Sequence, residues 1–169
     1  GLPVDLAEEV VPDIASTRRR SVPRGRSEYE AELEREVARA RRTGRPLSLV
    51  LVDVEDPTAD RLLQFAALLT RLTRVTDTVC RRRRDAFGIL LPETPEDGAR
   101  RFYSRIHEEV ARTFTHGGQT TFSTGIVEWR PNETGESLDA RARAAVEGRA
   151  SAGGGGVDFG DRALDEPSS

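Results

Sequence analysis

Hydrophobic residues along the chain occur either at helical spacing or in short continuous runs, a pattern that predicts alternating helices and strands. Helical spacing or helix-favouring composition predicts helices over residues 27–43, 59–74, 94–114 and 137–150. Short apolar runs predict strands over residues 47–54, 75–81, 85–91, 120–129 and 157–159. This order of elements predicts an α/β fold, in which helices flank a central mixed sheet that contains an antiparallel hairpin.

Residues that favour helix ends set the expected boundaries of two helices. Ser27 is expected to cap the first helix, and Gly44 followed by Pro46 is expected to end it. Thr94 is expected to cap a later helix, with Pro95 in its first turn. These signals separate each of the two predicted helices from the predicted strand next to it in the sequence.

Charge and composition divide the chain into three parts. Residues 1–26 form a lead-in that is acidic at first and then basic, residues 27–159 form one domain, and residues 160–169 form a polar tail. The chain of 169 residues has 33% charged residues and a net charge of -3, so a duplex-binding domain is not favoured. Without an apolar run long enough for a signal peptide or a membrane helix, we expect a soluble, cytoplasmic domain.

The basic residues are all Arg, and the single cysteine is Cys80. Arg keeps its charge and its planar fork, which suits it to guanine and phosphate recognition. A lone Cys cannot form an intramolecular disulfide, and its apolar surroundings predict a buried structural thiol. Two isolated histidines, His107 and His116, do not suggest a metal site.

The two predicted strands at 75–81 and 85–91 are joined by a tight, charged turn. This layout resembles the signature turn of the diguanylate cyclase (GGDEF) domain, and the resemblance covers roughly residues 27–159. It implies the mixed sheet of a nucleotidyl-cyclase-like fold. The five positions that read Gly-Gly-Asp/Glu-Glu-Phe in the family are occupied here, in order, by Arg83, Arg84, Asp85, Ala86 and Phe87.

The resemblance implies that the catalytic site has been lost. Asp53 and Asp85 match the two metal-binding acids of the family, but Ala86 replaces the following Glu. Arg83 and Arg84 replace glycines that allow close approach to phosphate. The positions that match groups binding the base and the triphosphate are Ala59, Ala150 and Gly154. We therefore expect no cyclase activity, no catalytic residues, no bound metal and no cofactor.

The resemblance also implies that a second family site is kept, the inhibitory Arg-x-x-Asp site that binds the product cyclic di-GMP. Arg74 and Asp77 match this motif, and Arg105 matches an additional Arg from the helix after the signature turn. Arg can donate two hydrogen bonds to guanine O6 and N7, and Asp can accept from guanine N1 and N2. An Arg-x-x-Asp alone is a weak signal in an Arg-rich chain, but its register to the turn strengthens it. The alternative is a surface salt bridge.

Further arginines are candidates for the rim of this ligand site. They are Arg71 and Arg101, one helical turn before Arg74 and Arg105, and, with a weaker claim, Arg81. The run Arg81–Arg84 is expected to remain in solvent, or to contact phosphate or a partner protein.

Together these residues predict a catalytically inactive domain that acts as a cyclic di-GMP receptor. The ligand is expected as an intercalated dimer, which could also bridge two copies of the domain. The alternative is a nucleotide-independent module for dimerisation or protein docking. Nucleic-acid binding through the Arg runs is disfavoured by the acidic pI and the lack of an aromatic platform, and no membrane contact is expected.

Overall fold

A computed structural model of the chain describes residues 26–114, 120–151 and 156–158. The predicted tail, nearly all of the predicted lead-in, His116 and Gly154 lie outside the described residues, as does Phe159, the last residue of the strand predicted at 157–159. Within the described residues the elements follow one another as α2 (Arg26–Thr43), β1 (Leu47–Val54), α3 (Ala59–Leu72), β2 (Thr78–Arg83), β3 (Ala86–Pro92), α4 (Glu96–Thr113), β4 (Phe122–Glu128), α5 (Gly135–Ser151) and β5 (Gly156–Asp158).

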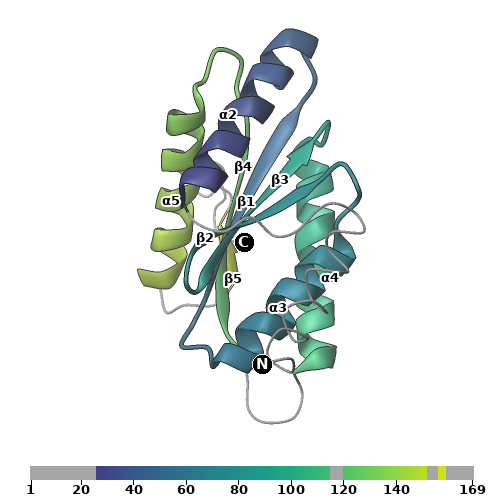
Figure 1. The fold of residues 1–169 in the computed structure, drawn as a ribbon, viewed down its shortest axis with the longest axis vertical. Coiled ribbons are helices and arrows are strands. Elements are labelled where there is room, and N and C mark those ends of the chain that lie inside the picture. Colours follow the sequence, from purple (N-terminus) through teal and green to yellow (C-terminus); the bar gives the residue numbers. More distant parts are fainter. Residues whose placement is uncertain (1–25, 115–119, 152–155, 159–169) are drawn as a thin grey trace, which may run out of the picture.

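The strands form a mixed sheet in the order β2-β3-β1-β4-β5, with β1 in the centre (Figure 1). Strand β1 pairs antiparallel with both β3 and β4, and β2 and β3 form the predicted antiparallel hairpin. Strand β5 pairs parallel with β4. The predicted fold class, a mixed sheet flanked by helices, is confirmed.

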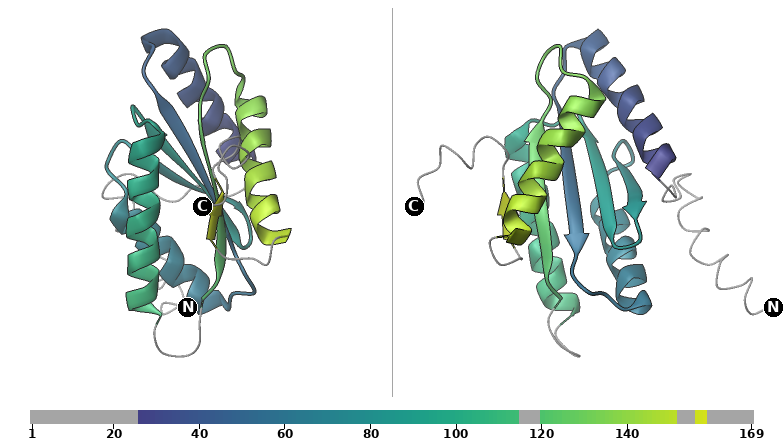
Figure 2. Two further views of the ribbon diagram at one scale, coloured as in Figure 1. Left: turned by 180° about the vertical axis from the view of Figure 1, so that it is seen from behind. Right: turned by 90° about the vertical axis from the view of Figure 1, so that its left-hand side faces the viewer.

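Helices cover both faces of the sheet, α3 and α4 on one side and α2 and α5 on the other (Figure 2). Successive residues of β1 point to opposite faces, so Val50 and Val52 pack beneath α3 and α4 while Leu49 and Leu51 pack beneath α2 and α5. Every one of these side chains is fully buried. The continuous apolar run 47–54 is therefore explained by burial of the strand on both faces.

The first predicted strand of the hairpin begins later than expected. Residues 75–77 belong to a turn, and β2 starts at Thr78. Val75, which the apolar pattern placed in the strand, is 76% exposed. Hydrogen bonds between Arg74 and Asp77 close the turn and keep the chain out of the sheet until Thr78.

Two predicted helix caps are wrong. Helix α2 already includes Arg26, so Ser27 lies inside it. The N-cap of α4 is Pro95, which has no side chain that can accept a hydrogen bond from the helix. The N–H of Glu96 instead donates to Glu128 Oε1 at 2.8 Å, so a carboxylate from β4 satisfies one of the free groups at the start of α4.

Cys80 is fully buried with a free thiol, as predicted. Burial raises the pKa of this thiol to about 12, with further raising by nearby Glu32 and Glu28. A thiol with so high a pKa remains protonated near neutral pH and is a poor nucleophile. Among the described helices, none combines the length and the apolar character that a membrane span requires.

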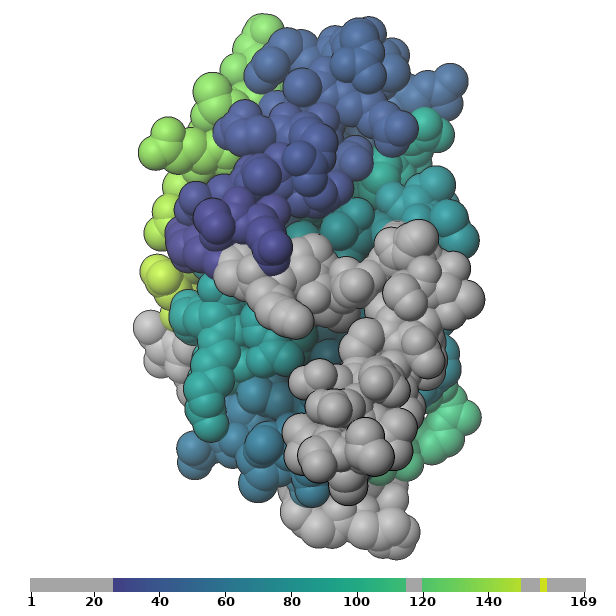
Figure 3. All heavy atoms as spheres, viewed as in Figure 1, coloured from purple at the N-terminus to yellow at the C-terminus, as the bar shows by residue number. Residues whose placement is uncertain are grey.

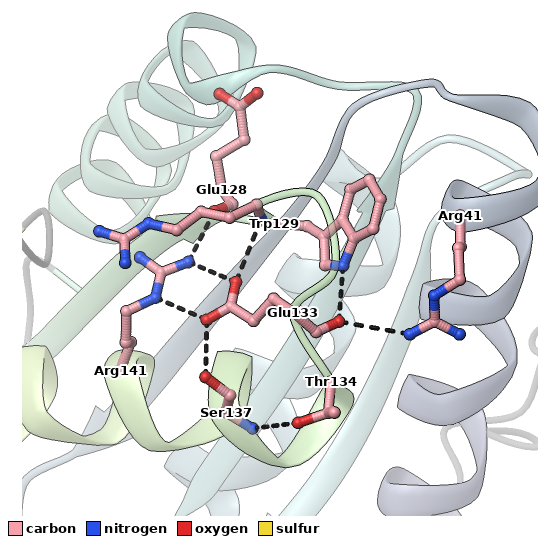
Figure 4. Close-up of polar contacts among 8 residues, drawn as sticks. Arg41, Glu128, Trp129, Glu133, Thr134, Ser137 and Arg141 are labelled. Carbon is pink, nitrogen blue, oxygen red and sulfur yellow. Dashed lines mark hydrogen bonds and ion pairs between the residues drawn. The ribbon is translucent and has the colours of Figure 1, made fainter.

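A buried polar network holds the loop between β4 and α5 (Figure 4). The indole N–H of Trp129 donates to the Glu133 carbonyl at 3.0 Å, and Arg41 of α2 donates to the same oxygen. The Glu133 carboxylate accepts from Arg141 at 2.7 and 2.8 Å, from Ser137 and from the backbone N–H of Arg130. Trp129 is also buried in the apolar cluster beneath α2 and α5, so it packs in the core as well as joining this network.

This network makes stability depend on pH in the acid range. Burial alone would raise the pKa of Glu133, but hydrogen bonds from Arg141, the Arg130 N–H and Ser137 outweigh it and lower the pKa below its ordinary 4.5. A lowered folded-state pKa contributes stability that is complete above the unfolded-state pKa and is lost as the pH falls through the folded-state pKa. We expect Glu133→Gln to lower the free energy of unfolding by about 1–3 kcal/mol at pH 7.

The difference between wild type and Glu133→Gln is expected to shrink below pH 4.5, as measured by urea unfolding at several pH values. Glu136→Gln, at an exposed position in the first turn of α5, is the matched control and should follow wild type closely. A difference that stayed constant down to pH 3 would show that the Glu133 charge does not carry the effect.

Candidate functional site

The predicted ligand-binding turn lies at the surface between α3 and β2. The N–H of Asp77 donates to the Arg74 carbonyl at 3.0 Å, and the Asp77 carboxylate accepts from the Arg74 N–H at 2.8 Å. These two bonds close the turn through the backbone of Arg74. The two residues are therefore held together by a backbone hydrogen bond and by the buried Asp77 carboxylate, without any contribution from the Arg74 side chain.

The Arg74 guanidinium also lies against the Asp77 carboxylate. Nη2 is 3.3 Å from Oδ1 and Nε is 3.4 Å from Oδ2. The Arg74 side chain is 59% exposed, whereas that of Asp77 is 3% exposed. The salt bridge considered as an alternative to ligand binding is thus present, and it leaves much of Arg74 accessible while it covers Asp77.

Thr94 also contacts the same guanidinium. Arg74 Nη2 donates to Thr94 Oγ1 at 2.8 Å and to the Pro92 carbonyl at 3.4 Å, and the Thr94 hydroxyl donates to the Pro92 carbonyl at 2.8 Å. Thr94, predicted as a helix cap, therefore positions Arg74 instead. The sequence alone gave no sign of this role, because the contact joins residues on either side of the whole hairpin.

The other predicted cations come from α3 and α4, which pack on each other in the same layer as the turn. Arg71 Nη2 is 3.3 Å from Glu109 Oε1 of α4. The Arg105 guanidinium lies 5.7 Å from the centre of the Phe102 ring, and both Arg101 and Arg105 are exposed. The structure brings Arg74 and Asp77 into contact and places Arg71, Arg101 and Arg105 as exposed cations on the two helices of this layer.

Arg81 lies toward the other end of β2. Its Nη1 donates to the Arg84 carbonyl at 3.0 Å, and its guanidinium lies 5.2 Å from the centre of the Phe87 ring. Both contacts hold the hairpin, so Arg81 has a structural role whether or not a ligand reaches it.

The hairpin turn that matches the catalytic turn of the resembling family carries a guanidinium between two carboxylates. Arg83 Nη2 donates to Asp53 Oδ2 at 3.1 Å, and its Nε is 3.7 Å from Asp85 Oδ1. Asp53 stands next to Ala86 across the β1–β3 pair, so the sheet register brings these groups together. Figure 3 shows the hairpin, in teal, at the surface below the purple first turn of α2.

Arg82 contradicts the expectation that the Arg81–Arg84 run remains in solvent. Its side chain is 1% exposed, its guanidinium lies 5.5 Å from the centre of the Tyr29 ring of α2, and its Nη1 is 3.9 Å from Asp53 Oδ1. The alternation of side chains between the two faces of a strand could have predicted this burial. Cys80 and Arg82 are two residues apart, so they share the face that α2 covers.

The connection that follows Asp53 is short. Residues 55–58 alone connect β1 to α3, Ala59 is the exposed first residue of α3, and Ala86 is fully buried. Over the part of the chain that the structure describes, no three or more His, Cys, Asp or Glu side chains are grouped so that they could hold a metal ion.

Comparisons with known proteins agree with this fold. Residues 24–155 match the sequence profile of the family described as diguanylate cyclase, GGDEF domain. Diguanylate cyclase DgcP of Pseudomonas aeruginosa is 29% identical over 136 residues, which cover 72% of this chain and 20% of DgcP. The chain thus corresponds to about a fifth of the length of that relative.

Solved structures show the same fold. The GGDEF domain of DgcB from Caulobacter crescentus, in complex with cyclic di-GMP, superposes with a TM-score of 0.73 at 22% identity and covers 81% of this chain and 91% of that one. Diguanylate cyclase SiaD of Pseudomonas aeruginosa, in complex with its activator SiaC, superposes with a TM-score of 0.73 at 24% identity and covers 92% of this chain and 68% of that one.

Proposed function

The chain belongs to the diguanylate cyclase GGDEF domain family, and we propose that this member binds cyclic di-GMP without synthesising it. The observation that carries the proposal is a contrast between the two ends of strand β2. Before its first residue, the turn at Arg74 and Asp77 presents an ordered, exposed guanidinium. At its last residue, Arg83 contacts the two carboxylates that match the metal-binding acids of the family.

The catalytic end of β2 lacks what phosphoryl transfer requires. That chemistry depends on metal ions and on positioning of the phosphates. Here Asp53 and Asp85 are paired with arginines, Ala86 stands where the family has a catalytic Glu, and side chains of Arg83 and Arg84 replace two glycines. We therefore propose that the domain is not an enzyme and uses neither a metal nor a cofactor.

The binding end of β2 offers groups that match the edges of guanine. Arg74 is oriented by Asp77 and Thr94, so little side-chain freedom is lost when it binds a ligand. A bidentate contact from such an Arg to guanine O6 and N7 contributes about 1–3 kcal/mol. The Asp77 carboxylate is covered by Arg74 and contributes by orienting that guanidinium. Arg105, with Arg71 and Arg101 at the rim, supplies positive charge for the phosphates.

Cyclic di-GMP is proposed to bind as an intercalated dimer between the turn and α4, either within one domain or between two copies. DgcB, which shares the fold, has been solved in complex with cyclic di-GMP, which supports this choice of ligand. Binding would then shift the population of domain arrangements and pass the signal to attached or partner proteins.

Calorimetric titration of the wild-type chain tests the proposal. We expect saturable binding of about two cyclic di-GMP molecules per site, and weak or no binding of cyclic di-AMP, because adenine lacks the O6 acceptor and N2 donor of guanine. Incubation with GTP and Mg²⁺ should yield no cyclic di-GMP by chromatography.

Absence of both heat and thermal shift at high ligand concentration would contradict the receptor role. It would favour the nucleotide-independent docking module instead, for which the exposed Val75 and Leu63 offer apolar contact positions. Formation of cyclic di-GMP from GTP would contradict the loss of catalysis.

A further inference from the structure

The fold family implies a divalent cation beside Asp53 and Asp85, and the residues of this chain do not fit one. Arg83 reaches both carboxylates, with Nη2 at 3.1 Å from Asp53 Oδ2 and Nε at 3.7 Å from Asp85 Oδ1. Its single guanidinium therefore takes the position between two carboxylates that a bridging cation would need. A cation would have to displace this side chain before it could contact either oxygen.

The second oxygen of Asp53 also faces a positive charge. Asp53 Oδ1 is buried and has no hydrogen bond in the structure, and Arg82 Nη1 lies 3.9 Å from it. An orphaned carboxylate oxygen is a position that could accept a cation. However, the Arg82 side chain is 1% exposed and cannot move away into solvent, so a cation on Oδ1 would be strongly repelled.

The charges of the cluster balance without any added ion. Two carboxylates, Asp53 and Asp85, stand against two guanidiniums, those of Arg82 and Arg83. Arg stays protonated at any pH at which the protein is folded, so the two positive charges of the cluster are always present. A divalent cation in addition would leave the cluster with an excess of positive charge in partly buried surroundings.

From this juxtaposition we infer that the Arg83 guanidinium, backed by Arg82, is a built-in counter-cation that closes the Asp53–Asp85 pair to divalent metal ions. The cluster also fastens the hairpin to the centre of the sheet, because Asp53 belongs to β1 and both arginines belong to β2. The inference concerns the catalytic end of β2 and is independent of whether cyclic di-GMP binds at Arg74.

Removal of Arg83 should therefore open to a metal ion the two oxygens that its guanidinium contacts, Asp53 Oδ2 and Asp85 Oδ1. Arg83→Ala is a mild change for the fold, because the side chain is 54% exposed. Arg84→Ala is the matched control, since Arg84 is an exposed Arg in the adjoining turn and its loss changes the net charge equally. The probe is Mn²⁺, whose paramagnetism removes amide signals of nearby residues in ¹⁵N-edited NMR spectra.

In the wild-type chain and in Arg84→Ala, the amide signals of Asp53 and Asp85 are expected to persist at millimolar Mn²⁺. In Arg83→Ala the same signals should be lost selectively and should return when excess Mg²⁺ is added. In a parallel thermal-shift measurement, Mg²⁺ should raise the unfolding temperature of Arg83→Ala but not that of the wild-type chain or of Arg84→Ala. The reason is that an ion that binds only the folded state stabilises it.

Loss of these signals in the wild-type chain would overturn the inference directly, and this arm requires no variant. Retention of the signals in folded Arg83→Ala would show that Arg83 does not exclude the cation. Equal loss in both variants would assign the effect to net charge instead. Since cyclic di-GMP is absent from every arm, the outcome is separate from that of the receptor test.

Discussion

Replacement of Arg74 by alanine is expected to weaken cyclic di-GMP binding by about 5- to 150-fold, which corresponds to about 1–3 kcal/mol. The reason is geometric. Arg74 is the exposed partner of its ion pair with Asp77, and Thr94 and the Pro92 carbonyl hold its guanidinium in place. Alanine removes the donors that are proposed to contact a guanine edge, and it removes the guanidinium that pairs with the Asp77 carboxylate. The measurement is a calorimetric titration beside wild type.

Two further variants make this prediction specific. Arg105→Ala should weaken binding in the same way if the ligand spans the turn and α4. Arg42→Ala is the control, because Arg42 lies in the last turn of α2, on the opposite side of the sheet from α3 and α4. Affinity reduced equally by Arg42→Ala and Arg74→Ala would mean that general charge, and not the turn, attracts the ligand.

Asp77 needs a gentler substitution than Arg74. Its carboxylate is buried and accepts the N–H that closes the turn, so Asp77→Ala would disturb the backbone as well as the ligand site. Asp77→Asn keeps an acceptor for that N–H, and thermal unfolding of each variant separates loss of binding from loss of fold.

Phe65→Ala is expected to lower the free energy of unfolding by about 3–5 kcal/mol. Phe65 is fully buried on α3 at the centre of an aromatic cluster. Its ring centre lies 6.1 Å from that of Phe87, 6.3 Å from that of Phe114 and 5.4 Å from that of Phe122. The substitution opens a cavity that rigid neighbours cannot close, and single domains have only about 5–15 kcal/mol of stability in total.

Chemical denaturation at pH 7 measures this effect, with Leu63→Ala as the control. Leu63 lies on the same helix and is 52% exposed, so its truncation should change stability by no more than about 0.5 kcal/mol. If Phe65→Ala and Leu63→Ala were equally mild, the aromatic cluster could not be the core that holds α3 to the sheet.

The order and the layers of the fold could be predicted from the sequence because burial leaves a periodic trace. The spacing of Tyr29, Leu33, Val37 and Ala40 predicted α2, and these residues are its buried ones in the structure. The unbroken apolar run 47–54 predicted a strand, and in the structure this strand, β1, is covered on both faces. Boundaries were less accurate where a side chain controls the backbone, as when Asp77 closes the turn that delays β2.

The sequence identified residues of the candidate sites but not the contacts between them. The motif positions identified Arg74 and Asp77, yet not that Asp77 would be covered by Arg74 or that Thr94 would orient the pair. Likewise, the run Arg81–Arg84 is uniform as a sequence, whereas in the fold Arg82 is buried and its neighbours Arg83 and Arg84 are exposed.

The sequence by itself determined which segments are helices and strands, the family of the domain and the replacement of its signature residues. Only the tertiary structure decided what the replacing residues do. Burial of Arg82 requires α2 and Tyr29 above β2, and the contact of Arg83 with Asp53 requires β1, β3 and β2 side by side in one register. Such contacts join segments distant along the chain. The charge of an Arg is known from its identity, but the partner of that charge is set by the packing of the whole sheet.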